Sequence, residues 1–205
     1  LLEDASASAS HPYLTNHLTE ICLEAGATCT HIALQREGRA AYHLSHVFAY
    51  QANDSHFNSH VVNLGGAWVR SDKSIYLQGP QATCTLNGLY ALNDQQHMDH
   101  HTAIFHEVGA CHSQQDYKGV IAGQAKAVFN GRVVVAEQAQ HTQAQQHNKN
   151  LLLSAGASVN TEPQLEIYAD DVRCSHGATV GALNPDALFY LASRGLPLKD
   201  ATQLL

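Results

Sequence analysis

The chain has 205 residues, a length at which a single domain with one core is the usual arrangement. Its 18 Asp and Glu against 11 Lys and Arg give a net charge of -7, too few cations for a phosphate-binding surface, so nucleic acid is not the expected partner. No apolar run approaches the roughly 20 residues that cross a bilayer, so a membrane is not expected either.

Short β-type runs, broken by polar or Gly-containing turns, fill residues 19–180. They begin with "TEICLEA" and "THIALQ" and end with "PQLEIYADDVRC", in which Leu165 and Ile167 alternate with Glu166 and Tyr168. Helical periodicity is missing over the whole span. The sequence therefore predicts an all-β body.

Two architectures are compatible with such strands. A sandwich or barrel would be closed by hairpins, whereas a solenoid would repeat strands and turns at similar intervals. The stretches "NGLYAL" (Asn87 to Leu92) and "NGRVVVAE" (Asn130 to Glu137) echo one another, about two coils apart if a coil takes roughly 20 residues. Asn-Gly also favours hairpin turns, so the periodicity by itself leaves both architectures open.

The pattern changes after the last of these runs. Asn184 can cap a helix, Pro185 suits its first position and Gly195 can end it, so "DALFYLASRG" predicts a helix. The following "PLKDATQLL" predicts the start of a second helix. We therefore divide the chain into a β core, residues 1–183, and a C-terminal helical segment, residues 184–205. The leucines of this segment are expected to pack against the end of the β core or against a partner.

The motif "HMDHH" brings possible metal ligands together. In an extended strand His97, Asp99 and His101 lie on one face, where they could form a metal site, a polar ladder or a turn. His106 could join any of these arrangements.

Catalytic motifs are missing from the sequence. Ser113, Ser154 and Ser158 have no recognisable base and orienting acid, and nothing resembles G-x-S-x-G or a phosphate-binding loop. We therefore expect the chain not to be an enzyme and not to hydrolyse ATP. The Gln-rich tract "AEQAQHTQAQQHN" leads directly into the apolar "KNLLLSAGA", so we expect ordered stacking of its Gln side chains rather than disorder.

The stretch "EIYADDVRCSHGATVG" gathers Asp170, Asp171, Cys174 and His176. Cys174 and His176 are two residues apart and would share one face of a strand. A thiolate and an imidazole are common ligands of iron, zinc or a sulfur-bridged cluster. The alternative is a buried thiol beside an imidazole that bonds to the backbone in a turn.

Five cysteines, an odd number without a C-x-x-C pair, are spread along the chain: Cys22, Cys29, Cys84, Cys111 and Cys174. This pattern indicates reduced thiols of a cytoplasmic protein. Acidic residues stand near the N-terminus, where a secretory signal would carry basic ones. Because the chain begins without Met, we expect it to be a piece of a longer protein.

Long stretches of the chain follow the pattern of one known family. The stretches are "AQHTQAQQHNKNLLLS", "PQLEIYADDVRCSHGATVGALN" and "LFYLASRG", together with "YLTNHLTEICLEAGA", "NGLYALNDQQHMDHHTAIFHE" and "YKGVIAGQAKAVFNGRVVV". They resemble the SufB/SufD family of iron-sulfur cluster assembly proteins. Within the family, "CSHGATVG" is most similar to SufD, since SufB has an acidic residue where Gly177 stands here. The resemblance covers nearly the whole chain.

The resemblance implies a right-handed parallel β-helix with a C-terminal helical segment, in which the Asn-Gly echo marks coil turns. It also implies a non-catalytic scaffold that pairs with a SufB-like subunit through the β-helices and docks a SufC-like ATPase on its C-terminal helices. A nascent iron-sulfur cluster would form transiently at the SufB interface, with His176 at the family's interfacial His and Cys174 beside it.

One imidazole and one thiol cannot hold a cluster that takes four ligands, so no cofactor is expected to stay tightly bound to the isolated chain. Asp170 or Asp171 could orient the His176 ring. Exposed sheet edges predict a homodimer when the chain is isolated. Two alternatives stay open, a β-helical carbohydrate-active enzyme and a purely structural bracing subunit.

Overall fold

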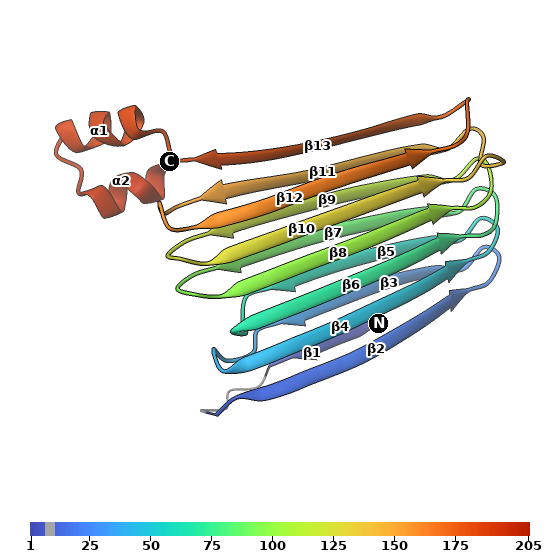
Figure 1. Ribbon diagram of the computed structural model, residues 1–205, viewed down its shortest axis with the longest axis horizontal. Coiled ribbons are helices and arrows are strands. Elements are labelled where there is room, and N and C mark those ends of the chain that lie inside the picture. The colour runs from blue at the N-terminus through green and yellow to red at the C-terminus, as the bar shows by residue number, and fades with distance from the viewer. Residues whose placement is uncertain (7–10) are drawn as a thin grey trace.

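The computed structural model describes residues 1–6 and 11–205. Within them, a long run of strands precedes two short helices (Figure 1). The strands are β1 (Leu2–Ala5), β2 (Tyr13–Leu23), β3 (Thr28–Gln35), β4 (Ala41–Gln51), β5 (His56–Asn63), β6 (Trp68–Leu77), β7 (Thr83–Leu92), β8 (His97–His106), β9 (His112–Ile121), β10 (Lys126–Val135), β11 (Gln143–Leu152), β12 (Ser158–Ile167) and β13 (Arg173–Ala182). The helices are α1 (Pro185–Ser193) and α2 (Leu198–Leu204).

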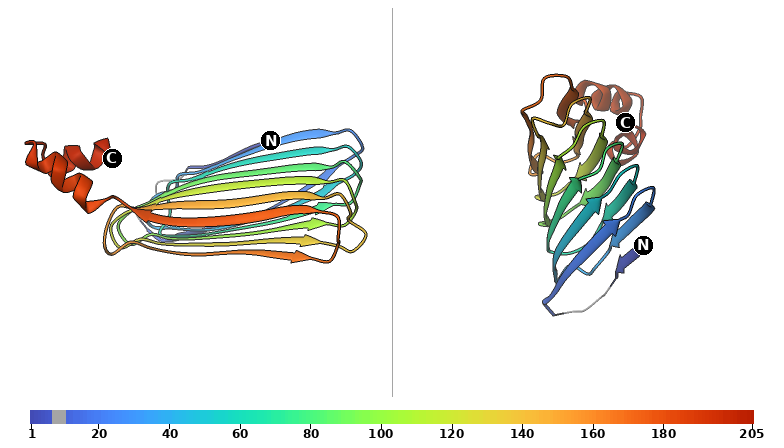
Figure 2. Two further views of the ribbon diagram at one scale, coloured as in Figure 1. Left: turned by 90° about the horizontal axis from the view of Figure 1, so that it is seen from above. Right: turned by 90° about the vertical axis from the view of Figure 1, so that its right-hand side faces the viewer.

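The strands form a two-sheet parallel solenoid. Odd-numbered strands make a seven-stranded sheet in the order β1-β3-β5-β7-β9-β11-β13, and even-numbered strands make a six-stranded sheet in the order β12-β10-β8-β6-β4-β2. Lys126 is in register with His97 of the preceding coil and Ser158 of the following one, so a coil takes about 30 residues. Figure 2 shows the two sheets facing each other along the stack. The parallel β-helix is confirmed, whereas the repeat of roughly 20 residues is wrong.

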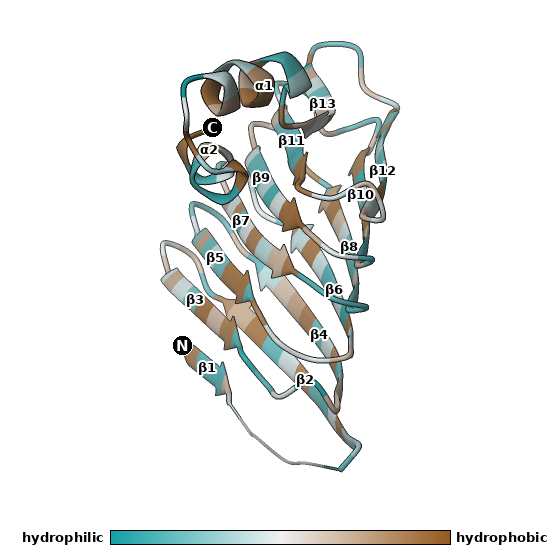
Figure 3. Ribbon diagram, turned by 90° about the vertical axis from the view of Figure 1, so that its left-hand side faces the viewer, coloured by the Kyte–Doolittle hydropathy of each residue, from teal (hydrophilic) through white to brown (hydrophobic). Residues whose placement is uncertain are grey.

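In the middle of the solenoid, alternation of side chains places one half of each strand inside. Buried and partly exposed residues alternate along all ten positions of β6 and of β8, because successive side chains of a strand point to opposite faces. Figure 3 shows the same alternation as bands of hydropathy along the strands. The inner faces of both sheets close over a core whose centre is aromatic, with the ring centroids of Tyr117 and Phe129 5.1 Å apart.

Glycines in the middle of strands make room for the largest of these side chains. Gly88 is in register with Tyr117, and Tyr90 is in register with Gly119. A Cβ on Gly88 would lie 2.2 Å from Cε1 of Tyr117, and one on Gly131 would lie 2.0 Å from Nε2 of Gln146. The expectation that the two Asn-Gly pairs mark coil turns is therefore wrong. Both pairs lie in the middle of strands, one on each sheet.

The real coil turns depend on left-handed backbone. Every turn from an even-numbered to the next odd-numbered strand between β2 and β11 holds one residue with positive φ: Gly26 (72°), Asp54 (54°), Gln81 (63°), Ala110 (58°) and His141 (62°). Such backbone costs an L-residue about 1–2 kcal/mol, so Gly is its usual occupant. Here four of the five occupants carry side chains, which is why the repeat is hard to recognise from Gly spacing.

Helix α1 follows the predicted capping. The Oδ1 atom of Asn184 accepts a hydrogen bond from the Asp186 N–H at 2.8 Å, and Gly195 has a φ of 86° after the helix. No residue of α1 is buried, and both helices extend beyond the ends of the strands (Figures 1 and 2). The helices pack on each other rather than on the strands, so the packing of Leu188, Leu191 and Leu196 against the end of the β core is not found, and their packing against a partner stays a prediction. Phe189 is 76% exposed and Tyr190 57% exposed.

The Gly–Tyr pairing predicts a marked stability difference between two mid-strand glycines. Gly88→Ala should lower the free energy of unfolding by about 1–3 kcal/mol, because the buried Tyr117 ring cannot move aside. Gly177→Ala in β13 is the matched control, since its Cβ would meet only Cδ2 of His147, at 3.5 Å. Urea denaturation of both variants checks this expectation, and equal midpoints would contradict it.

Candidate functional site

The C-terminal coil carries the residues that the sequence singled out. Strand β13 pairs with β11 and strand β12 pairs with β10, and each ends its sheet in the described part of the chain. The outer edges of both strands therefore present unpaired backbone N–H and C=O groups. Cys174 and His176 lie on β13, directly at this end of the solenoid.

Cys174 and His176 belong to the inward-facing row of β13, as the two-residue spacing predicted. Cys174 is in register with Ala144, and His176 with Gln146. The Cys174 side chain is half-buried and packs against the apolar core, and this burial raises the pKa of its thiol. His176 is exposed, and its ring makes no hydrogen bond or ion pair with residues 1–6 or 11–205. The imidazole is therefore the more available ligand of the two.

The two carboxylates before β13 do not orient His176. Asp171 forms an ion pair with His141, with Oδ2 2.9 Å from Nδ1, and the carbonyl of Asp171 accepts the His141 N–H at 2.6 Å. Asp170 is exposed and makes no such contact within the described chain. The expected orienting role is thus not realised by either residue, and Asp171 instead ties the last turn to the one before it.

The "HMDHH" residues form a polar ladder. His97, Asp99 and His101 do share the outer face of β8, but Asp99 lies between Arg70, at 2.7 Å, and His101, at 2.8 Å. A carboxylate neutralised by a guanidinium is a poor metal ligand, and no group of three His, Cys, Asp or Glu suited to a metal occurs among the described residues. The metal-site interpretation is therefore not supported.

His106 is separated from this ladder because it points inward. Its Nε2 atom lies 2.9 Å from Oγ of Ser113 on the facing sheet, inside the solenoid. His106 and Ser113 thus belong to the interior, where neither can join a site on the outer face of β8.

The Gln-rich tract is ordered, as expected. Residues 143–152 form β11, and Gln146 is fully buried. Its Nε2 atom donates to Oε1 of Gln115, one coil earlier, at 2.9 Å. Gln115 in turn donates through Nε2 to Oγ1 of Thr102 on the facing sheet. This amide ladder crosses the interior immediately beneath His176.

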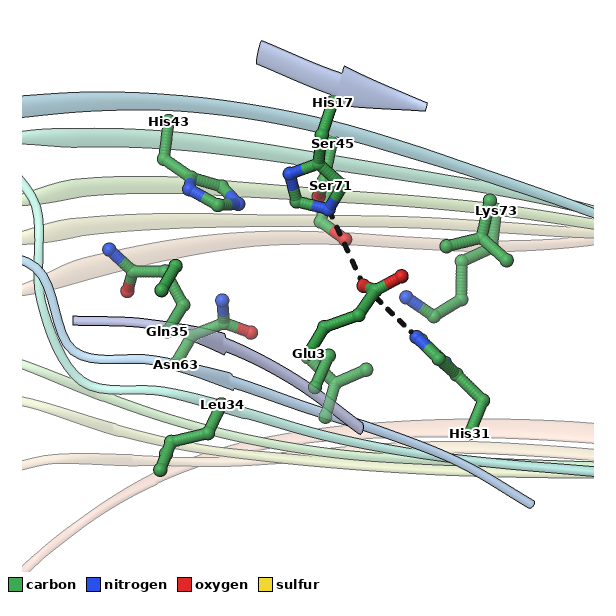
Figure 4. A pocket seen from close by; sticks show the side chains of 14 residues that line it. Glu3, His17, His31, Leu34, Gln35, His43, Ser45, Asn63, Ser71 and Lys73 are labelled. Atoms are coloured by element: carbon green, nitrogen blue, oxygen red, sulfur yellow. Dashed lines mark ion pairs between the residues drawn. The ribbon is translucent and has the colours of Figure 1, made fainter. Parts of the chain in front are cut away.

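A second polar cluster, not predicted from the sequence, lies inside the N-terminal coils. Figure 4 shows the Glu3 carboxylate between two imidazoles, with Oε2 3.1 Å from Nε2 of His31 and 3.4 Å from Nε2 of His17. Nearby, Nδ1 of His43 lies 2.7 Å from Oε2 of Glu37. The signal was present in β4, where His43 occupies a position that strand alternation assigns to the core.

Lys73 adds an amine to this interior cluster. Burial lowers the pKa of its ammonium to about 8, although Glu3 and Asp72 oppose the shift. Burial also lowers the pKa of His31 and of His43, in spite of their carboxylate partners. The cluster therefore binds protons less readily in the folded state than the same side chains do in water.

Comparisons with known proteins give a consistent result over the whole chain. The family model for the SufBD core domain of SUF-system FeS cluster assembly matches residues 1–205. The iron-sulfur cluster assembly protein SufD of Escherichia coli (strain K12) is 41% identical over 185 residues, which cover 90% of this chain and 44% of that protein.

Two further relatives have similar coverage. An iron-sulfur cluster assembly SufBD family protein of Synechocystis is 40% identical over 196 residues, 95% of this chain and 43% of the relative. The chloroplastic protein ABCI7 of Arabidopsis thaliana is 36% identical over 196 residues, 94% of this chain and 41% of the relative. The chain thus spans less than half the length of these curated relatives. Among its described residues, no helix is long and apolar enough to cross a membrane.

Buried imidazoles predict that the fold weakens in mild acid. Burial lowers the pKa of His100 to about 3 and that of His106 to about 4, so the folded protein binds fewer protons than the unfolded chain below pH 6.5. At pH 5 each should cost about 2 kcal/mol of stability relative to pH 7.5. Urea midpoints at the two pH values test this, and His100→Phe should lessen the loss. His97→Phe, on the outer face of the same strand, should retain it.

Proposed function

The chain belongs to the SufBD core family of the SUF iron-sulfur cluster assembly system, and on this premise we propose that it is the core of a SufD-type scaffold subunit. The family match over residues 1–205 carries the proposal. The resemblance noted in the sequence is confirmed, including its similarity to SufD. Membership in this family favours a scaffold over a β-helical carbohydrate-active enzyme.

The C-terminal coil is the proposed surface for a SufB-like subunit. The free edges of β12 and β13 can each accept a further parallel strand, so that the partner continues the solenoid. Tyr168, Ile167 and Val180 are exposed on this coil and would be covered by the partner. The same edges account for the expected homodimer when no partner is present.

His176 is the proposed ligand for the nascent cluster, which is the cargo of the complex. It is exposed at the edge of the last coil, and a neutral imidazole can bind iron through either ring nitrogen. Cys174 is the second candidate, although its raised thiol pKa keeps it protonated and packed on the core. The remaining ligands would come from the partner across the interface.

The C-terminal helices are the proposed docking site of a SufC-like ATPase. Phe189, Tyr190 and Leu198 are exposed on α1 and α2, away from the solenoid. An apolar helix face of this kind is a usual recognition element between proteins. The ATPase would supply nucleotide hydrolysis, and the five unpaired thiols of the chain fit a reducing compartment such as the cytoplasm.

The ligand role predicts a specific loss of cargo. In the full-length protein purified with its SufB-like and SufC-like partners, His176→Ala should lower iron and sulfide per complex without preventing assembly. Cys174→Ala should lower them less, because that thiol mainly packs on the core. His147→Ala on the outer face of β11 is the control, and undiminished iron and sulfide in His176→Ala would leave a purely bracing subunit as the better account.

The docking role predicts a loss that is confined to the ATPase. Replacing the exposed Phe189 by Asp places a charge on the apolar face of α1, so the full-length protein should no longer co-purify with the SufC-like subunit while it keeps the SufB-like one. Leu18→Asp, at an apolar residue of β2 that is 62% exposed, is the control. Retention of the ATPase by Phe189→Asp would contradict the docking site.

A further inference from the structure

His176 continues a column of inward-facing residues. Gln115, Gln146 and His176 occupy the same register position on β9, β11 and β13. Adjacent strands lie about 4.8 Å apart, so each side chain of such a column lies directly against the one in the preceding coil. The imidazole is therefore the next side chain of the column that carries the amide ladder.

The ladder has a direction. Gln146 donates through Nε2 to Oε1 of Gln115 at 2.9 Å, and Gln115 donates through Nε2 to Thr102. The Gln115 amide directs its Nε2 atom toward Thr102 and its Oε1 atom toward Gln146. With Gln115 in this orientation, a flipped Gln146 amide would place two carbonyl oxygens against each other, so the orientation of Gln146 follows from that of Gln115.

This orientation leaves one acceptor without a donor. The Oε1 atom of Gln146 is buried and has no hydrogen-bond partner among the described residues. The residue is 0% exposed, and the place of a Cβ on Gly131 is taken by its Nε2 atom, so the side chain has little room to turn. A buried carbonyl without a donor is costly and is usually explained by a missing partner.

The neighbouring amides on β11 do not share this deficit. Asn148 donates to the Tyr90 hydroxyl and accepts from Asn150, and Asn150 accepts from the same hydroxyl. Both asparagines are thus satisfied within the core. Gln146 differs from them in having an unsatisfied acceptor while its register neighbour in the last coil is an imidazole with no partner of its own in the described chain.

We propose that Gln146 is the positioning residue of His176, its Oε1 atom accepting a hydrogen bond from one ring N–H of the imidazole. A neutral imidazole has a single N–H, so an acceptor at one nitrogen selects one tautomer and leaves the other nitrogen free as a ligand. The exposed ring reaches Oε1 by rotation about its side-chain torsions. This inference deepens the proposed function, because the free nitrogen is the one offered to the cluster.

The test reads the tautomer of His176 directly. The full-length protein, purified without partners and carrying ¹⁵N-labelled histidine, gives ring nitrogen signals that are assigned by their loss in His176→Ala. The wild type should show a single tautomer with a protected ring N–H. Gln146→Met, which keeps the volume and removes the acceptor, should shift His176 to the mixture of tautomers of a free imidazole and lose that protection.

A control variant separates positioning from a general effect on β11. Gln145→Met, on the outer face of the same strand, should leave the wild-type signals unchanged. The proposal is overturned if His176 in the wild type already shows the mixture of tautomers of a free imidazole. It is also overturned if Gln146→Met leaves the ring signals of His176 unaltered. The wild type could show a single tautomer while the His176→Ala complex keeps its full iron content. That pair of results would support the hydrogen bond to Gln146 and contradict the role of His176 as a ligand.

Discussion

In-register parallel stacking is the constraint on which the rest of this structure depends. Each inward side chain lies against the residue one coil earlier and one coil later, so a position can be understood only together with its column. Where Tyr117 fills the interior, its column neighbour is Gly88, and where Tyr90 does, it is Gly119. Volume is therefore balanced between coils rather than within a strand.

Stacking also decides how polar groups can enter the core. A lone buried amide would be costly, but amides one above another satisfy each other, as Gln115 and Gln146 do. The last strand of this sheet places an imidazole rather than an amide in the column, so the ladder ends on the unsatisfied oxygen of Gln146 beneath His176. The end of a solenoid is thus chemically distinct from its middle even when the sequence pattern is the same.

Features that depend on residues close together in the sequence were predicted correctly, whereas the length of the repeat and the place of the coil turns were not. The capping of α1 by Asn184 and the outward alignment of His97, Asp99 and His101 depend on neighbours in sequence, and both were predicted. The length of the repeat was not, because the turns that set it use side-chain-bearing residues such as Gln81 in left-handed backbone. Asn-Gly pairs were mistaken for turns because Gly88 makes room for Tyr117 and Gly131 for Gln146, residues that are distant in the sequence.

The sequence by itself determined the family, the all-β body, the two helices and the identity of the residues worth examining, since these follow from residue order and short-range periodicity. Only the tertiary structure decided which of those residues meet. It paired Asp171 with His141 rather than His176, neutralised Asp99 with Arg70, and set Gln146 beneath the imidazole. The reason is that the partners are about 30 residues apart, a separation set by coil length and register, which no local pattern encodes.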